Sequence, residues 1–399
     1  MGTSEAVLVD LVPAASVLPN IGKDDFLHAG PPLESWNLAC GALHGAVIGT
    51  LMHEGRARDA TEAEEMASSG AVRLISASDH GVMATYGGVI TPSTHVFVVE
   101  NTSSGSRAYA AINEGRGKAL RYGSHDQEAL ARYAWLESTF AAALGAAIRS
   151  GSGIDLFHIL AQALHMGDDG HSRQKAASAL FANAVSPDIV ETCADTDTAS
   201  SVIRFLAENE IFHLPLTMAA AKATMVSAEG IRGSSVVTAM AANGADWGIK
   251  ISGCGDRWFT APVPIVQGTY FEGFGPEYAS PVIGDSEIAE TMGLGAFALS
   301  GAPALGRFMG GSAEAARAMA VEMYEITVSE HPRFKIPALE YRGTPMGIDL
   351  HRVLGTGITP VFNTGIAHAE PGVGQIGAGF GRVPMECFEA ASVALSDMP

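Results

Sequence analysis

The sequence predicts an α+β protein in which a helical middle part separates two parts of mixed strands and helices. Three observations carry this prediction: a hydrophobic share of 47% over 399 residues, helix periodicity concentrated in one interval, and β-branched, glycine-rich runs on both sides of it. We expect an N-terminal α+β domain (1–123), a helical middle domain (124–230) and a glycine-rich C-terminal α+β domain (231–399).

The N-terminal part combines short strands with one helix. The β-branched runs Val72–Ser76 and His95–Glu100 are typical of strands, and the small-residue stretch Ser35–Glu54 is typical of a helix. This mixture predicts an α+β arrangement.

The middle part shows helix starts and helix spacing. Ser124 and Gln127 form a plausible capping box. Apolar residues then recur at helix spacing, namely Leu130, Tyr133, Leu136, Phe140, Leu144 and Ile148. Further helices are expected over Asp155–Met166, from Ser172 to about Ala184, and from starts at Asp197 and Pro215.

Strand-like runs return after Gly230, and one helix interrupts them. The expected strands lie at Val236–Thr238, Trp247–Ser252 and Ile358–Asn363, and the expected helix covers Ala313–Ser329. The GxGxxGxG string of Gly372–Gly379 comes near the end of the chain, without the βαβ unit and following acidic residue of a dinucleotide site. A Rossmann site is therefore not favoured.

Charge and composition restrict the partners. The net charge of −19 repels phosphate backbones and anionic lipid surfaces, so we expect neither nucleic acid nor membrane as a partner. Acids at Glu5 and Asp10 precede the first base, Lys23, which is the reverse of a signal peptide, and a cytoplasmic location is expected. The four cysteines form no CxxC pair, which favours buried, reduced thiols.

The first candidate site is a basic, glycine-rich segment, Asn113–Gly123. It concentrates Arg116, Lys118 and Arg121 in a chain that has few bases, and its glycines allow backbone N–H groups to approach a ligand. This pattern predicts an anion site. A solvated turn with ordinary ion pairs is the alternative.

The second candidate is the glycine-containing loop His165–Arg173, which connects two expected helices. His171 and Arg173 lie at or beside the start of the second helix, where unpaired N–H groups attract anions. The residues Asp168, Asp169, His165 and His171 could also be metal ligands, but their spacing matches no standard site, and we expect no metal.

Three further segments carry polar residues within glycine-rich backbone. They supply Asn243 with Arg257, Asp285 with Glu290, and Asn363 with His368. Each segment alone could be turn chemistry. Together with the two candidates above, they predict one polar cleft.

The motifs resemble the YlbE-like family, long a domain of unknown function. The resemblance rests on Met166–Arg173, Asn113–Lys118, Leu120–Gly123, Gly284–Ile288 with Glu290, and Asn363–His368, and it runs from about Pro31 to the C-terminus. It implies α+β parts at both ends and a small helical insert. The sequence departs from the family pattern at Val82–Tyr86, Asp169, Ser172 and Gln174.

The resemblance also implies a function. Family members lie beside FdrA, a protein similar to acyl-CoA synthetases, and are implicated as a subunit of oxamate carbamoyltransferase, which exchanges a carbamoyl group between oxalurate and phosphate. We therefore expect a carbamoyltransferase-type enzyme or subunit acting on a small anionic ureido substrate, in a homo- or hetero-oligomer with a possible FdrA-like partner. An amide-forming or amide-cleaving enzyme on a related substrate, or a non-catalytic scaffold subunit, remain the alternatives.

Carbamoyl transfer requires a cationic cradle, donors aimed at the carbonyl oxygen, and a base for the attacking nitrogen. The expected catalytic residues are Asp168, His171, Arg173, Asp285 and Glu290. The expected substrate-binding residues are His80, Asn113, Glu114, Lys118, Arg121, Asn243, Arg257, Asn363 and His368. Within these sets we assign Lys118, Arg121 and Arg173 to anion binding and His171 to carbonyl polarisation or proton transfer. Orientation or base work is assigned to Asp168, Asp285 or Glu290. No cofactor is expected.

Overall fold

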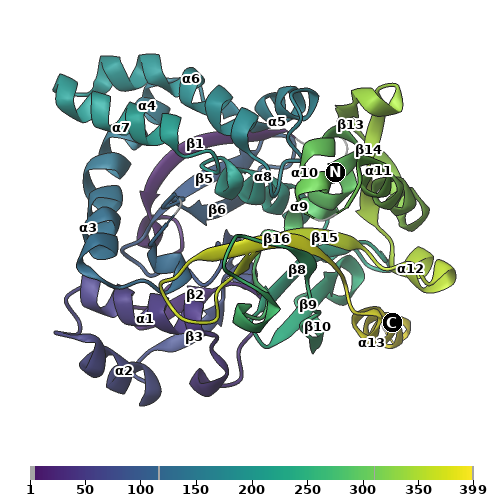
Figure 1. The fold of residues 1–399 in the computed structure, drawn as a ribbon, viewed down its shortest axis with the longest axis horizontal. Coiled ribbons are helices and arrows are strands. Elements are labelled where there is room, and N and C mark those ends of the chain that lie inside the picture. The colour runs from purple at the N-terminus through teal and green to yellow at the C-terminus, as the bar shows by residue number, and fades with distance from the viewer. Residues whose placement is uncertain (1–4, 116, 310, 398–399) are drawn as a thin grey trace.

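The computed structural model describes residues 5–115, 117–309 and 311–397. It contains antiparallel sheets and helices that do not alternate strictly with strands, which confirms the α+β class (Figure 1). Among the described residues, no helix is long and apolar enough to cross a membrane. Arg116, one of the three bases of the first candidate segment, lies outside the described residues.

The largest sheet has the strand order β4-β6-β5-β1-β7. Its strands are β1 (Ala6–Pro13), β4 (Val82–Met83), β5 (His95–Asn101), β6 (Arg107–Ala111) and β7 (Ile154–Asp155). The pairs of β5 with β1 and β6 are antiparallel, and β4 joins β6 in parallel. Strand β5 is buried at its centre, as the β-branched run His95–Glu100 predicts.

Helices cover this sheet. They are α3 (Gln127–Trp135), α4 (Ala141–Ser150), α5 (Leu156–His165), α6 (Lys175–Thr192), α7 (Thr196–Glu208) and α8 (Leu214–Val226), with a π-helical turn at Leu136–Phe140 joining α3 to α4. Helices α4 and α8 contact the sheet directly, while α6 packs on α4 and α7 packs on α6, so α6 and α7 form the outer layer (Figure 1). Phe97, Phe140, Phe181 and Phe212 meet in the shared core.

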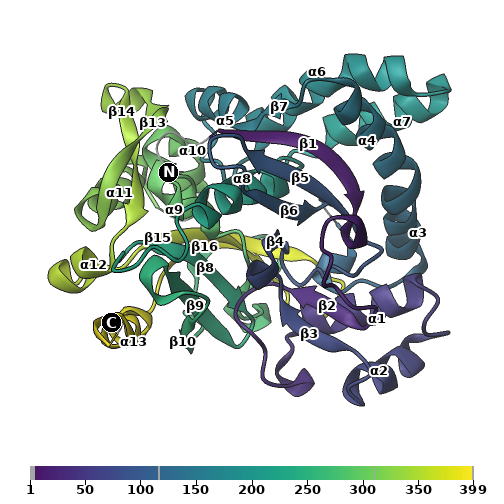
Figure 2. The same cartoon turned by 180° about the vertical axis from the view of Figure 1, so that it is seen from behind.

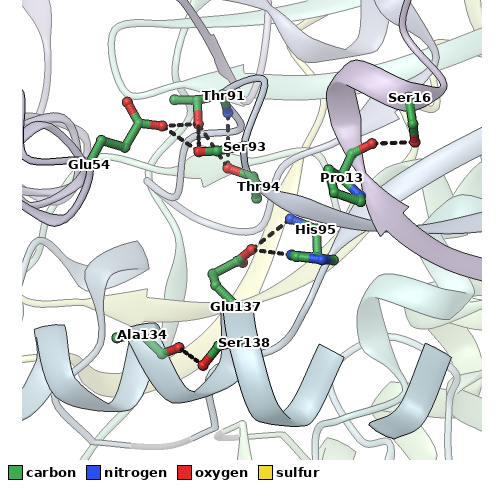
Figure 3. A network of polar contacts seen from close by, with 10 residues as sticks. All are labelled: Pro13, Ser16, Glu54, Thr91, Ser93, Thr94, His95, Ala134, Glu137 and Ser138. Atoms are coloured by element: carbon green, nitrogen blue, oxygen red, sulfur yellow. Dashed lines mark hydrogen bonds and ion pairs between the residues drawn. The ribbon is translucent and has the colours of Figure 1, made fainter. Parts of the chain in front are cut away.

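A smaller unit lies at the N-terminal side. It consists of the parallel pair β2 (Asp25–His28) and β3 (Arg73–Ser76) with α1 (Gly41–His53) and α2 (Ala60–Ser68). Glu54, after α1, accepts hydrogen bonds from Thr91 and Ser93, and Glu137 accepts two from His95 at the start of β5 (Figure 3). These carboxylates tie the loop before β5 to the helices on either side.

The C-terminal half contains three sheets. This count covers the described residues up to 397. The first sheet has the order β10-β9-β8-β12, with β8 (Val237–Asn243), β9 (Asp246–Ile251), β10 (Trp258–Pro262) and β12 (Ile283–Gly284). The second has the order β11-β16-β15, with β11 (Gln267–Tyr270), β15 (Val361–Ala367) and β16 (Gln375–Arg382), and the third pairs β13 (Thr327–Ile336) with β14 (Arg342–Ile348). The helices here are α9 (Ile288–Thr291), α10 (Pro303–Phe308), α11 (Ala313–Glu322), α12 (Leu350–Thr356) and α13 (Met385–Ser396).

Strands β15 and β16 run across the middle of the molecule. Both views place them between the helices around the large sheet and the β8–β10 sheet (Figures 1 and 2). The glycine string Gly372–Gly379 enters β16, where Gly377 and Gly379 pair with Tyr270 and Gly268 of β11. The second half of the string is therefore part of an antiparallel sheet, and its first half, Gly372–Gly374, lies in the turn before β16.

Several local expectations differ from the structure. The helix expected over Ala313–Ser329 ends at Glu322, and β13 begins at Thr327. Asp126, not Ser124, caps α3 by accepting the N–H of Ala129 at 2.9 Å. The helix after the second candidate segment begins at Lys175, not Ser172, and continues past Ala184 to Thr192 through Pro187.

The hydrophobic cores do not stop at the expected domain boundaries. One core contains Phe97 from the N-terminal part, Phe212 from the middle and Phe334 from the C-terminal part. A second core, around β2, α1 and α2, includes Ile283. The division at residues 123 and 230 stays a prediction, and the packing joins the three parts closely.

Candidate anion-binding site

A cavity of about 640 Å³ lies where the N-terminal, helical and C-terminal parts meet. Its polar lining comes from separate loops and strands and comprises Thr85, Tyr86, Arg121, Tyr122, His171, Ser172, Arg173, Gln174, Lys175, Glu210, Ser286, Thr364 and Gln375. Its apolar lining comprises Ile211, Leu214, Phe271, Ala304, Leu305, Phe308, Met309, Val373 and Ala378. The size lies within the range of small-molecule sites.

The loop between α5 and α6 supplies the centre of the polar wall. Asp169 Oδ1 accepts hydrogen bonds from the backbone N–H groups of His171 (2.9 Å) and Arg173 (2.8 Å). Asp168 Oδ2 accepts the N–H of Ala177 at 2.8 Å and so satisfies a donor in the first turn of α6. The two adjacent carboxylates thus fix the loop that presents His171 and Arg173.

His171 is paired with a buried carboxylate. Its Nδ1 lies 2.9 Å from Glu290 Oε1 on α9, and both side chains are buried. Glu290 Oε1 also accepts the N–H of Ala296 at 3.2 Å. Since Nδ1 is engaged, Nε2 is the ring nitrogen left for a ligand in the cavity; it has no hydrogen-bond partner among the described residues.

The backbone around Glu290 leaves no room for an extra carbon. Gly295 has a φ of +62°, which favours glycine, and a Cβ at this position would overlap the Glu290 carboxylate. Its N–H donates to the carbonyl of Asp169 at 2.7 Å. Gly295 therefore joins the α9 segment to the α5–α6 loop.

Asn363 on β15 completes this buried network. Its Nδ2 donates to Asp169 Oδ2 at 2.6 Å, and its backbone N–H lies 3.4 Å from Glu290 Oε1. The neighbouring Thr364 and Gly365 line the cavity. Asn363 therefore contacts the carboxylates of Asp169 and Glu290 and does not line the cavity itself.

Burial and charge set the protonation of this network. Burial acts to lower the pKa of His171, but the neighbouring carboxylates, Glu290 first, outweigh burial and raise that pKa to about 9. Burial raises the pKa of Glu290, and His171 opposes that rise. Burial raises the pKa of Glu287 to about 7, although His171 again opposes the rise. His171 is therefore a cation near neutral pH.

Two arginines contribute further positive charge. Arg173 is 39% exposed, and its Nε lies 3.4 Å from Asp168 Oδ1. Burial raises the pKa of Asp168 to about 6, so this carboxyl is still ionised near pH 7. The Arg121 guanidinium donates to the carbonyl of Gly115 at 2.6 Å and lies 4.6 Å from the centre of the Tyr122 ring. The cavity thus combines an imidazolium and two guanidinium groups.

Several buried polar atoms near this wall have no hydrogen-bond partner among the described residues. On residues that line the cavity they are Arg121 Nε, Ser172 Oγ and Gln174 Oε1. Buried polar atoms in native proteins are nearly always satisfied, so unpartnered donors and acceptors beside one cavity indicate a polar ligand or ordered water.

Tyr86 closes one side of the site. It lies in the left-handed region with a φ of +54°, which is uncommon for a residue with a bulky side chain. Its hydroxyl donates to the carbonyl of Gly365, and its ring meets Tyr122 edge to face at 4.9 Å. In the sequence, Tyr86 stands out only as a departure from the family pattern. A positive φ at a tyrosine leaves no signal in the sequence.

Asp285 lies behind the wall and does not line the cavity. Its two carboxylate oxygens accept the N–H groups of Gly30 (2.8 Å) and Ala84 (3.0 Å). Burial raises its pKa to about 7. The geometry assigns Asp285 to bracing β12 against the N-terminal part, and its neighbour Ser286 is the residue that lines the cavity.

The other expected binding residues fall into two groups. Asn113 and Glu114 are buried braces: Glu114 accepts the N–H groups of Leu120 (2.8 Å) and Arg121 (2.9 Å), and Asn113 accepts that of Gly115 (2.9 Å). They shape the loop that carries Arg121 instead of lining the cavity themselves.

The second group lies away from the cavity lining. Lys118 is exposed and pairs with Asp126 at 2.6 Å, His368 stacks on Tyr278, and His80 and Arg257 are exposed. Asn243 donates to the carbonyl of Pro31 and caps its own turn by accepting the N–H groups of Ala245 and Asp246. Of the five expected segments, the one from Asn243 to Arg257 contributes no residue to the cavity lining.

Sequence reasoning missed most of the remaining lining residues. Gln375 and Thr364 lie within motifs that the sequence singled out, but alternation along β15 and β16 was needed to tell which side chains face the cavity. Leu305, Phe308 and Phe271 carry no chemical signature. No group of three or more His, Cys, Asp or Glu side chains among the described residues is arranged to hold a metal ion.

Comparison with known proteins identifies the family of this chain. A family model described as oxamate carbamoyltransferase subunit AllG matches residues 72–286. Oxamate carbamoyltransferase subunit AllG of Escherichia coli (strain K12) is 42% identical over 392 residues, which cover 98% of this chain and 93% of that protein. The uncharacterized protein YahG of the same organism is 41% identical over 388 residues, which cover 97% and 82% of the two chains.

A solved structure shows the same fold. The crystal structure of a conserved protein of unknown function from Enterococcus faecalis V583 matches with a TM-score of 0.96 and 39% identity, covering 98% of this chain and 94% of that chain. These matches confirm the family resemblance drawn from the sequence motifs. The chain belongs to the family of oxamate carbamoyltransferase subunit AllG.

Proposed function

We propose that this chain is the substrate-binding and catalytic subunit of a carbamoyltransferase that acts on a small ureido or amido carboxylate, with oxamate and oxalurate as the reference pair. The observation that carries the proposal is the convergence of His171, Arg121 and Arg173 on one cavity. The family described above is named for this activity.

The proposed reaction transfers a carbamoyl group between nitrogen and phosphate oxygen. In one direction, a phosphate oxygen attacks the carbamoyl carbon of oxalurate, the bond from that carbon to the oxamate nitrogen breaks, and the nitrogen takes up a proton. The products are carbamoyl phosphate and oxamate. Both substrates are anions, and negative charge develops on the carbonyl oxygen during the attack, so fixed cationic donors favour the reaction.

Each residue receives a role from its position. His171 donates from Nε2 to the carbonyl oxygen, and Glu290 holds the ring in its cationic form through Nδ1. Arg173 and Arg121 bind carboxylate or phosphate oxygens. Asp169 and Asn363 are positioning residues, because they hold the His171 loop and the Glu290 segment without lining the cavity.

Arg173→Ala tests this proposal. Loss of a charge-assisted hydrogen bond costs about 1.5–3 kcal/mol, so we expect about a tenfold to hundredfold loss in phosphate affinity or in transfer rate. Calorimetry with phosphate and steady-state assays with oxalurate plus phosphate, run with and without an FdrA-like partner, measure these changes. Thermal stability should stay close to that of the parent, because the Arg173 side chain is 39% exposed.

Arg257→Ala is the matched control, since Arg257 is an exposed arginine outside the cavity lining. It should leave affinity and rate unchanged. Unchanged activity of Arg173→Ala at equal stability would remove Arg173 from the site. Absence of phosphate, oxamate and oxalurate binding to the parent protein would contradict the proposed function as a whole.

A further inference from the structure

One wall of the cavity is apolar. The stretch from the start of α10 to the residue that follows it contributes four lining residues, Ala304, Leu305, Phe308 and Met309, and all four are apolar. The loop after α5 contributes His171, Ser172 and Arg173 to the same cavity. The α10 stretch therefore supplies only apolar lining residues, whereas the segment before α8 and the segment that enters β16 supply both kinds, as Glu210 with Ile211 and Gln375 with Ala378 show.

The apolar wall has a buried base and an open aromatic rim. Leu305 and Met309 are 8% and 2% exposed, whereas Phe308 and Phe271 are 46% and 39% exposed. The two phenylalanine rings lie 6.2 Å apart. Large exposed aromatic side chains beside a cavity are costly to leave in water, and a bound apolar group would cover them.

The cavity also exceeds the needs of a small anion. Its volume of about 640 Å³ lies within the range of roughly 300–1,000 Å³ of sites that enclose drug-sized ligands. Oxamate has two carbons and no apolar group, so it makes no use of Leu305, Phe308 or Phe271. In the proposed reaction the cationic wall binds phosphate and the anionic end of the other substrate, and neither of these groups matches the apolar side chains of Leu305, Phe308 and Phe271.

We propose that the substrate of this site carries an alkyl or aryl group beside its amido or ureido carboxylate, and that Leu305, Phe308 and Phe271 bind that group. This inference rests on the proposed function, because it takes the cationic wall as the site of the anionic end. It names an N-substituted amido or ureido acid as the substrate class.

Binding of a matched pair of probes tests the inference. Calorimetry measures the affinities of the full chain for oxamate and for N-butyloxamate, which differ only in the alkyl group. Each fully buried methylene adds up to about fourfold in affinity, so we expect N-butyloxamate to bind at least about tenfold more tightly than oxamate. In Phe308→Ala this ratio should fall to about threefold or less, and Phe308→Leu should restore most of it.

Phe274→Ala is the control, because Phe274 is 38% exposed and lies outside the cavity lining. It should leave the ratio unchanged. An affinity ratio of N-butyloxamate to oxamate near one in the parent protein overturns the inference, and so does a high ratio that Phe308→Ala does not reduce. In both cases, binding of oxamate leaves the proposed function standing. Absence of binding by oxamate, N-butyloxamate and inorganic phosphate overturns both.

A second polypeptide is the competing occupant of the aromatic rim. Size-exclusion chromatography with light scattering compares the mass of the parent protein and of Phe308→Ala. A loss of assembly in the variant, together with an unchanged affinity ratio, would assign the rim to a protein interface and overturn the substrate inference.

Discussion

At the scale of single residues, the buried histidines show what makes His171 different. Burial lowers the pKa of His28 to about 4 and that of His213 to about 3, and burial with nearby cationic groups lowers that of His331 to about 3. His171 is equally enclosed, yet Glu290 and its neighbours raise its pKa. A buried histidine is therefore neutral by default, and the carboxylate pair makes this one cationic.

This contrast predicts the pH dependence of anion binding. Because the pKa of His171 in the folded chain is about 9, phosphate affinity should hold from pH 7 to 8 and fall as the pH rises through about 9. Glu290→Gln removes the carboxylate and should move that loss to lower pH. NMR titration of the His171 ring measures the pKa directly, and a value below 6.5 in the parent protein would contradict the assignment.

The same pair predicts how stability depends on pH. A histidine whose folded pKa lies above its unfolded value of about 6.5 stabilises the fold fully below pH 6.5, and that contribution is lost as the pH rises through about 9. Urea unfolding between pH 6 and 9.5 should show a decline that His171→Gln reduces. An equal decline in both proteins would mean that other groups cause it.

Asp285 is expected to contribute to the stability of the fold. Asp285→Ala removes the acceptor of two buried N–H groups, those of Gly30 and Ala84, and each unsatisfied donor costs about 1–3 kcal/mol. We expect the free energy of unfolding to fall by about 2–4 kcal/mol in urea titrations. Ser286→Ala changes the adjacent residue, which lines the cavity, and should alter stability by less than about 1 kcal/mol. Equal effects of the two variants would contradict the bracing role.

At the scale of elements, helix α1 is held against the loop that carries Arg121. A Cβ at Gly45 would overlap the backbone of Gly123, directly after the turn Leu120–Tyr122. Gly45→Ala should therefore destabilise the fold by about 1–3 kcal/mol and weaken phosphate binding, because backbone atoms cannot move aside as a flexible side chain can.

Gly355→Ala is the matched helix variant, since a Cβ at Gly355 in α12 meets no atom within 4 Å. It should raise stability by about 0.5–1 kcal/mol through its helix propensity. Thermal denaturation of both variants measures the difference. A Gly45→Ala protein as stable as the parent would show that α1 does not need this close approach.

Element type followed from local sequence more readily than element boundaries did. Apolar spacing predicted the helices from Leu130 to Ile148, but Asp126 provides the cap that Ser124 was expected to provide. The run after Ala313 has helical character up to Glu322, and pairing with β14 then draws Thr327–Ile336 into a sheet. Tertiary pairing partners lie far away in sequence, so local patterns cannot supply them.

At the scale of the whole molecule, the sequence predicted the fold class, and four of the five predicted segments contribute residues to the cavity lining, but the sequence did not show which of their side chains face the cavity. Asp169 meets Asn363, 194 residues away, and His171 meets Glu290, 119 residues away. Polar residues in glycine-rich segments led to these regions, and their role in binding a substrate stays a prediction. Whether such a residue faces the cavity, as His171 does, or braces a turn, as Asn243 does, depends on packing that only the folded chain defines.

The shared core leads to a prediction about the helical middle part. Residues 124–230 contribute Phe140, Phe181 and Phe212 to a core that Phe97 of β5 and Phe334 of β13 complete. An isolated 124–230 fragment leaves these side chains without their partners. We expect it to keep helical far-ultraviolet circular dichroism, to bind a hydrophobic dye, and to unfold without a cooperative transition. The full chain, as the control, should unfold cooperatively and bind little dye. A sharp thermal transition of the fragment, with dispersed NMR signals, would contradict the shared core and would support 124–230 as an independently folding domain.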